Sequence, residues 1–306
     1  MRKTCLDMVH KLAVQDPRIV FIGSDLGHGT LADFARQIPE RFFMEGISEA
    51  NVIGMASGLA LCGKIVYVNT IASFLTRRCF EQIVLDLCLH KARVRLIGNG
   101  GGMVYAPLGP THETVEDLAV MRALPNMTVV APADADEMKR LMPQTVDYPG
   151  PIYIRLAKGY DPIVSADSPP FQIGRGMVVR SGTGALLITT GITLKIAMQA
   201  ADLLERNNIS CTILHLPTIK PLDHEAILRC AGQVGAIVTV EEHSIIGGLG
   251  GAVAEVIAEA DFSSPKRFKR LGLPDIFPDD YGSQSGLLKR YGLTPEHVAA
   301  TVRSLL

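Results

Sequence analysis

Short apolar segments rich in β-branched residues alternate with longer segments of helical periodicity through the first half of the chain. Five segments have the uninterrupted apolar character of strands that are buried on both faces. They are 19–25, 64–70, 94–100, 127–132 and 151–156. Helical periodicity fills most of the intervening sequence, at 48–62, 77–92, 114–123 and 134–146. This alternation predicts a parallel sheet with helices on both faces.

Residues 161–175 interrupt the alternation, because they are rich in Pro and Ser and have no strong periodicity. Such a segment is typical of a linker. A second α/β series follows, with strands expected at 184–191, 210–218, 235–242 and near 268–272, and helices at 193–206, 223–231 and 249–260. A closing helix is expected after Thr294, with Pro295 in its first turn. We therefore predict two doubly wound α/β domains, over 1–160 and 176–306.

Composition and charge narrow the class of protein. The 306 residues are 47% hydrophobic and 20% charged, as in a globular protein with a large core. The formal net charge of −1 provides no electrostatic footprint for nucleic acid or an anionic membrane. The most apolar helical segment is bracketed by Glu49, Asn51 and Lys64 and is too short to span a bilayer. The N-terminal segment is too polar for a signal peptide, so we expect a cytoplasmic protein.

Several common sites are excluded by their spacing. The six cysteines include no CxxC pair and no Cys/His spacing suited to zinc, so we expect reduced, mostly buried thiols and no metal site on this chain. There is no P-loop. The glycines of 247–253 lack the full dinucleotide-binding spacing, and we expect them to form a tight turn before a closely packed helix.

Chemistry-bearing side chains gather where predicted strands end. Glu49 lies just before the apolar helix, and other candidates that follow strands or begin helices are Phe74, Arg77, His112, Arg155 and Lys158. Ligands of open parallel sheets bind outside the carboxyl ends of the strands, so these residues are expected to converge. Each has a structural alternative; Glu49 by itself also fits a carboxylate that stabilises a helix N-terminus. Together they predict a pocket with an acid, an aromatic ring and cationic groups.

The motifs themselves resemble a known family. GISEANVIGMASGLAL, ASFLTRRCFEQI and GPTHETVEDLAVMRALPNMTVVAPAD resemble, in order and spacing, the pyrimidine-binding domain of transketolases and deoxyxylulose-5-phosphate synthases. TIKPLDHEAILRCAGQVGAIVTVEEHSIIGGLGGAVAEVI resembles the C-terminal domain of the same thiamine-diphosphate enzymes. The resemblance implies a pyrimidine-binding domain over 1–160 and a transketolase C-terminal-type domain over 176–306.

The resemblance also implies roles for cofactor-binding residues. Glu49 corresponds to the glutamate that hydrogen-bonds the aminopyrimidine ring and so promotes loss of the thiazolium C2 proton. Phe74 corresponds to the aromatic side chain that stacks on the pyrimidine, and Ile71 to another aromatic-lined position. Arg77 occurs in the same motif of the animal enzymes, and Asp25 corresponds to an aspartate near the cofactor.

Other positions correspond to the substrate site. His112 matches a residue that contacts donor oxygens, while Lys158 and Arg2 match phosphate-binding arginines. A lysine holds a phosphate as a point charge, without the bidentate geometry of arginine. Two positions depart from the family: Leu108 replaces an aspartate that reads hydroxyl configuration, and Gly100 replaces a substrate-contacting histidine. A branched, modified or sulfonated sugar is therefore an alternative to xylulose 5-phosphate.

The family's GDG…N motif, which supplies Mg²⁺ ligands for the diphosphate, is absent from this sequence. We therefore expect an N-terminal partner subunit to provide it, in an α2β2 assembly that transfers a two-carbon ketol unit from a ketose, expected to be phosphorylated, to an aldose. Three alternatives stay open: the β-subunit of a 2-oxoacid dehydrogenase first component, a deoxyxylulose-phosphate-synthase-like enzyme, and a non-catalytic scaffold or regulatory subunit that retains the fold.

Overall fold

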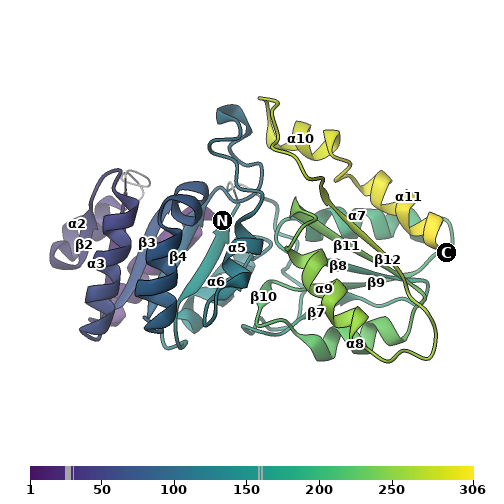
Figure 1. Ribbon diagram of the computed structural model, residues 1–306, viewed down its shortest axis with the longest axis horizontal. Helices are drawn as coiled ribbons and strands as arrows, with labels where there is room; N and C mark the ends of the chain where they lie inside the picture. Colours follow the sequence, from purple (N-terminus) through teal and green to yellow (C-terminus); the bar gives the residue numbers. More distant parts are fainter. Residues whose placement is uncertain (25–28, 30, 158, 160) are drawn as a thin grey trace.

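A computed structural model describes residues 1–24, 29, 31–157, 159 and 161–306 (Figure 1). Two α/β units lie side by side, each built on its own sheet. The predicted fold class is confirmed, whereas the exact boundaries at 160 and 176 stay predictions. None of the helices in the described ranges combines the length and the apolar character that crossing a bilayer requires.

The first sheet, as far as the chain is described, has seven strands in the order β10-β5-β6-β4-β3-β1-β2. Their bounds are β1 Ile19–Gly23, β2 Phe42–Met44, β3 Ile65–Ile71, β4 Val94–Asn99, β5 Thr128–Val130, β6 Ile152–Leu156 and β10 Thr218–Lys220. Strands β1 to β6 pair in parallel, and β10 pairs antiparallel with β5. The five strands predicted from apolar runs are fully buried, as a sheet covered on both faces requires.

Helices cover both faces of the first sheet. One face packs against α1 (Arg2–Gln15), α2 (Ala32–Gln37) and α6 (Ala135–Thr145). The opposite face packs against α3 (Glu49–Leu61), the segment 74–89 and α5 (Asp117–Ala123). Segment 74–89 is not the single α-helix expected over 77–92: it consists of π-helical turns η2 (Phe74–Arg78) and η3 (Ile83–Leu89), joined through α4 (Phe80–Gln82). Short 3₁₀ turns, η1 and η4, occupy Pro39–Arg41 and Ala106–Leu108.

The second sheet has the strand order β12-β11-β8-β9-β7 among the described residues. Its strands are β7 Met177–Arg180, β8 Ala185–Thr189, β9 Cys211–His215, β11 Ala236–Ser244 and β12 Arg267–Leu273. The helices around it are α7 Thr193–Glu205, α8 His224–Gly232, α9 Leu249–Ala258, α10 Gln284–Arg290 and α11 Pro295–Leu305. The expected cap of the closing helix is confirmed, because the Thr294 side chain accepts a hydrogen bond from the His297 backbone N–H.

Helix α5 begins three residues later than the expected start at 114. Thr114 and Gly102 exchange two backbone hydrogen bonds, of 2.8 and 2.9 Å, and form an isolated antiparallel bridge. A residue whose backbone is paired in this way cannot also begin a helix. The loop 100–116 is therefore a structured element that rises where the two units meet, beside α10 (Figure 1).

A buried guanidinium joins the two units. Arg155, at the end of β6, donates from Nε to Asp117 Oδ2 (3.0 Å) and from Nη2 to the carbonyls of Thr114 (3.1 Å) and Glu242 (2.8 Å). Tyr153 donates from its hydroxyl to the same carboxylate oxygen of Asp117 at 2.7 Å. The side chains of Arg155 and Asp117 are 7% and 0% exposed, so this ion pair is fully desolvated. It ties β6, the loop 100–116, α5 and β11 together.

We expect Arg155→Met to lower the free energy of unfolding by about 3–5 kcal/mol, because the substitution leaves the buried Asp117 carboxylate without its cation and two buried carbonyls without the donor that Arg155 supplies. Urea denaturation followed by circular dichroism measures the change. Arg175→Met is the matched control: Arg175 is 58% exposed, and its ion pairs at the surface contribute at most about 1 kcal/mol. Equal stabilities of the two variants would contradict a central role of Arg155.

Candidate functional site

Glu49 is the first residue of α3, and its side chain is buried, with 5% exposure. It packs among residues from the carboxyl ends of β1 and β3, which include Ser24, Asn69 and Thr70. The helix N-terminus favours a negative charge here, so the structural reason expected for Glu49 is present. The Glu49 carboxylate is also shielded from water, and it lies at the carboxyl ends of the strands, where ligands of open parallel sheets bind.

A cation and an aromatic ring lie next to this carboxylate. Arg78 Nη1 is 3.3 Å from both oxygens of Glu49. The same guanidinium lies over the ring of Phe74, with Cζ 3.7 Å from the ring centroid, which is a cation–π contact. His112 approaches Phe74 edge-on, with the ring centroids 5.1 Å apart. Glu49, Arg78, Phe74 and His112 thus form one cluster, defined here as the acid–aromatic cluster.

Arg78 is the member that the sequence interpretation missed. Arg77, its neighbour in the LTRR motif, instead forms an ion pair with Glu116 and donates to the carbonyls of Pro110 (3.2 Å) and Glu113 (2.9 Å). The structure therefore places Arg77 as a tie between η2 and the loop that carries His112. In the sequence, the two adjacent arginines are equivalent candidates for the position beside Glu49. The π-helical turns and the docked loop determine that Arg78 points toward Glu49 and Arg77 toward the loop.

Three of the five residues predicted for substrate binding line a common cavity, which His112 does not line. Arg2, Gly100 and Leu108 surround a space of about 190 Å³, together with Val104, Tyr105, Pro107 and Ala157. The Tyr105 ring connects this cavity to the acid–aromatic cluster, because its centroid is 6.5 Å from that of His112. Gly100 has a φ of +74°, and any side chain at this position would collide with the Tyr105 ring. The glycine is therefore a requirement of the local packing, and the side chain of Tyr105 occupies the space beside it.

Other predicted positions are less informative. Ile71 is the last residue of β3 and is buried in the sheet, opposite Asn99. Asp25 and Lys158 lie outside the described residues, so their predicted roles stay predictions. Polar side chains at the strand ends were overlooked by the sequence interpretation: Asn99 donates to Asn69 Oδ1 at 2.6 Å, and Ser24 donates to Thr70 Oγ1 at 3.0 Å. Their position directly after apolar runs was the available signal.

The described residues of the site offer no cluster of side chains suited to a divalent cation. Within the part of the chain that is described, no group of three or more His, Cys, Asp or Glu side chains could hold a metal ion. The cysteines have free thiols, and all except Cys62 are buried, which confirms the prediction of mostly buried thiols. A diphosphate with its magnesium therefore has no protein ligands of this kind among the described residues.

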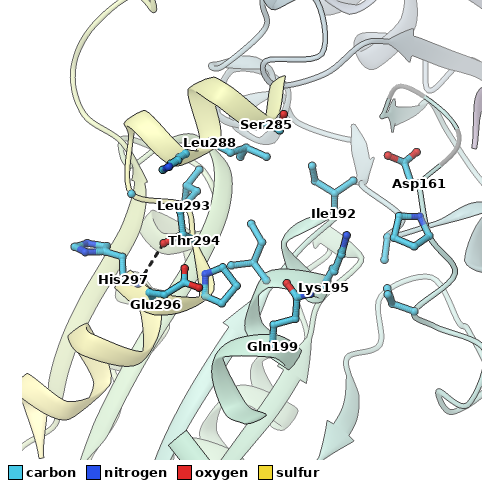
Figure 2. A pocket seen from close by; sticks show the side chains of 17 residues that line it. Asp161, Ile192, Lys195, Gln199, Ser285, Leu288, Leu293, Thr294, Glu296 and His297 are labelled. Atoms are coloured by element: carbon cyan, nitrogen blue, oxygen red, sulfur yellow. Dashed lines mark hydrogen bonds between the residues drawn. The ribbon is translucent and has the colours of Figure 1, made fainter. Parts of the chain in front are cut away.

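A larger cavity lies elsewhere, between α7, the segment 161–164 and the helices α10 and α11 (Figure 2). Its volume is about 790 Å³, and none of the predicted cofactor or substrate residues lines it. Lys195 and Asp161 line this cavity together with aliphatic side chains that include Ile192, Leu288 and Leu293 (Figure 2). The acid–aromatic cluster is therefore separate from this larger cavity.

Comparisons with known proteins agree on both units. Residues 1–160 match the family model of the transketolase pyrimidine-binding domain, and residues 174–298 match that of the transketolase C-terminal domain. A subunit of the apulose-4-phosphate transketolase of Phocaeicola vulgatus is 37% identical over 98% of this chain and 95% of its own length. A 6-deoxy-6-sulfo-D-fructose transketolase subunit of Clostridium sp. is 34% identical over 97% of this chain and 92% of its own length. A solved split-gene transketolase, described as an inactive β4 tetramer, superposes with a TM-score of 0.89 at 37% identity, covering 100% of this chain and 97% of that one.

The division of labour between the two arginines is testable. We expect Arg77→Ala to raise amide hydrogen exchange of residues 109–116 by roughly tenfold or more, because one ion pair and two hydrogen bonds to the loop are lost. Arg78→Ala is the matched control and is expected to leave exchange of this loop unchanged. Hydrogen–deuterium exchange with mass spectrometry measures both variants. Faster loop exchange in the Arg78 variant than in the Arg77 variant would contradict the assignment.

Proposed function

Because the chain belongs to the transketolase family, we propose that it is the pyrimidine-binding subunit of a two-subunit transketolase. Together with an N-terminal partner subunit, it transfers a two-carbon ketol unit from a ketose to an aldose. The observation that carries the proposal is the acid–aromatic cluster, in which the buried Glu49 carboxylate and the Phe74 ring are bridged by one guanidinium. A cytoplasmic location suits an enzyme of sugar metabolism and stays a prediction for this chain.

The cluster suits an aminopyrimidine ring. Thiamine diphosphate supplies the electron sink for ketol transfer, and the protein supplies binding and electrostatics. Glu49 would accept a hydrogen bond from the protonated ring nitrogen of the pyrimidine. The pyrimidine ring would stack on the face of the Phe74 ring that Arg78 now covers. The Arg78 side chain is 47% exposed, so turning it toward water sacrifices a contact worth about 1 kcal/mol or less. Arg78 therefore acts as a replaceable occupant of the stacking face.

The partner subunit is needed for the other half of the cofactor. Magnesium prefers several hard oxygen ligands around a diphosphate, and the described residues offer no such group. The relatives described above are themselves named as subunits, which supports a separate chain for this role. We place the cofactor at the interface between subunits, with the Mg²⁺ ligands on the partner, in an α2β2 assembly.

The substrate cavity supports an anionic ketose. Arg2 brings a cation to its wall, and Lys158 remains the proposed second cation. Leu108, which is 49% exposed, contributes an alkyl side chain where the family has an aspartate. This exchange removes a hydrogen-bond acceptor, and so favours a sugar that is branched or lacks a hydroxyl group at that position. Relatives named for apulose 4-phosphate and for a 6-deoxy-6-sulfo sugar are consistent with this class.

We expect Glu49→Gln to lower ketol transfer by about 100-fold or more in the complex reconstituted with partner, thiamine diphosphate and Mg²⁺, because an amide cannot share the proton of the ring nitrogen. The control is Glu40→Gln, whose side chain is 69% exposed and which is expected to retain wild-type activity. A panel of ketose phosphates and sulfonates, with a 2-oxoacid added, tests the alternative reactions. Activity retained in Glu49→Gln would support the scaffold alternative, and turnover of the 2-oxoacid alone would support the dehydrogenase alternative.

Leu108→Asp tests substrate selection separately. Restoring an acceptor in the cavity is expected to raise kcat/KM for xylulose 5-phosphate by roughly tenfold relative to a branched or deoxy ketose, which is the effect of one hydrogen bond. Leu108→Asn supplies an acceptor without the charge and is expected to give a smaller change in the same direction. An unchanged preference in both variants would show that Leu108 does not select the sugar.

A further inference from the structure

Glu113 is the least well accommodated charged residue of the loop 100–116. It follows His112 directly and is 1% exposed. Neither oxygen of its carboxyl group has a hydrogen-bond partner among the described residues. Its own backbone is well held, since its N–H donates to Gly109 and its carbonyl accepts from Arg77. The carboxyl group therefore lacks a hydrogen-bond partner although the backbone of the loop that carries it is well ordered by hydrogen bonds.

The backbone on either side of Glu113 is fixed at the junction between the two units. Thr114, the next residue, is bridged to Gly102, and the Val115 carbonyl accepts from Ser244 N at 2.7 Å. Gly102 lies against the carboxylate of Glu242, leaving no room for a side chain of its own. Glu242 is 3% exposed and already accepts hydrogen bonds from Met103 N (2.9 Å) and Gln284 Nε2 (2.8 Å). Two buried carboxyl groups that interact electrostatically thus lie where the loop docks on β11.

The charged groups and hydrogen-bond donors around Glu113 and Glu242 determine which of these two carboxyl groups holds a proton. Three ionisable groups on other elements interact with Glu113: Glu242 on β11, Arg77 on η2, and Tyr291 after α10. Arg77 already pairs with Glu116, and the buried hydroxyl of Tyr291 also lacks a partner in the described part of the chain. Burial and the neighbouring charge of Glu242 raise the pKa of Glu113 to about 7, against the opposing effect of Arg77. Burial also raises the pKa of Glu242, but the charge of Arg155 and the hydrogen bonds from Gln284 and Met103 oppose that rise. These groups stabilise an ionised Glu242 carboxylate, whereas the Glu113 carboxyl group accepts no hydrogen bond from the described residues.

We propose that Glu113 is a positioning residue that keeps the His112 loop docked across the junction only while its carboxyl group is protonated. Ionisation would place a second buried negative charge beside Glu242 with no hydrogen-bond donor to stabilise it. The loop would then move away from β11 to hydrate the group, and His112 and Tyr105 would move with it. The effect on ketol transfer rests on the proposed function, but the effect on docking does not.

Stability supplies a test that is independent of activity. A carboxyl group whose pKa is raised on folding contributes stability that is present below pH 4.5 and is lost as the pH rises through about 7. Glu113→Gln mimics the protonated group and does not titrate. We expect the variant to match wild type at pH 5 and to unfold roughly 2–5 °C higher at pH 8. Glu259→Gln, an exposed position, is the matched control and should follow wild type at both pH values.

Two further measurements locate the effect. In wild type, hydrogen exchange of residues 109–116, corrected for intrinsic rates, is expected to rise between pH 6 and pH 8, and this rise should be absent in Glu113→Gln. In the reconstituted complex, we expect kcat of wild type to decline above pH 7 and kcat of Glu113→Gln to show no such decline, with equal activities at pH 6. If the variant fails to fold, the exchange profile of wild type decides the matter.

The outcomes separate the two proposals. Identical pH profiles of unfolding and exchange in wild type and Glu113→Gln would overturn the role of Glu113. If Glu113→Gln kept the wild-type pH dependence and Glu242→Gln abolished it, the proposal would be overturned too, since Glu242 would then hold the proton. A difference in unfolding and exchange without any ketol transfer would support Glu113 and contradict the proposed reaction.

Discussion

The structure depends on the desolvated guanidinium of Arg155 where the two units meet. A buried cation must have its partners, so Asp117, the Thr114 carbonyl and the Glu242 carbonyl are all held within hydrogen-bond distance of one side chain. These partners come from the loop 100–116, from α5 and from the second sheet. The position of the His112 loop is therefore inseparable from the contact between the two units. A change that shifts one sheet relative to the other would be felt directly at the candidate site.

The local pattern of apolar and polar residues was sufficient to predict the elements whose burial follows directly from their own sequence. The buried strands of both sheets follow continuous apolar runs, and the closing helix follows its capping residue, Thr294. Pattern failed where a long-range contact overrides it. Thr114 looked helical until its backbone was paired with Gly102, and β10 is only three residues long and finds its partner in the other unit. Neither pairing leaves a periodic signal, because each depends on residues that are distant in the sequence.

The candidate site shows the same division. Strand-end reasoning brought Glu49, Phe74 and His112 together correctly as neighbours, because parallel strands present their carboxyl ends at one edge. It named Arg77 and missed Arg78, which lies beside Glu49 and Phe74, because the directions of the two side chains depend on turns that depart from α-helical geometry. It also overlooked Glu113, whose character comes entirely from an environment built by other elements. A carboxyl group reads as an ordinary surface charge in sequence, and only burial without donors makes it unusual.

The pairing of β10 with β5 has a consequence for the order in which the chain is made. Residues 1–160 leave the ribosome well before Thr218–Lys220, so during synthesis β5 is an open sheet edge with unpaired backbone groups. The first unit is completed only after the linker, β7, β8, α7 and β9 have emerged. Nascent chains are exposed to edge-to-edge association throughout this interval. Chaperone contact at that stage would protect the same edge that β10 later covers.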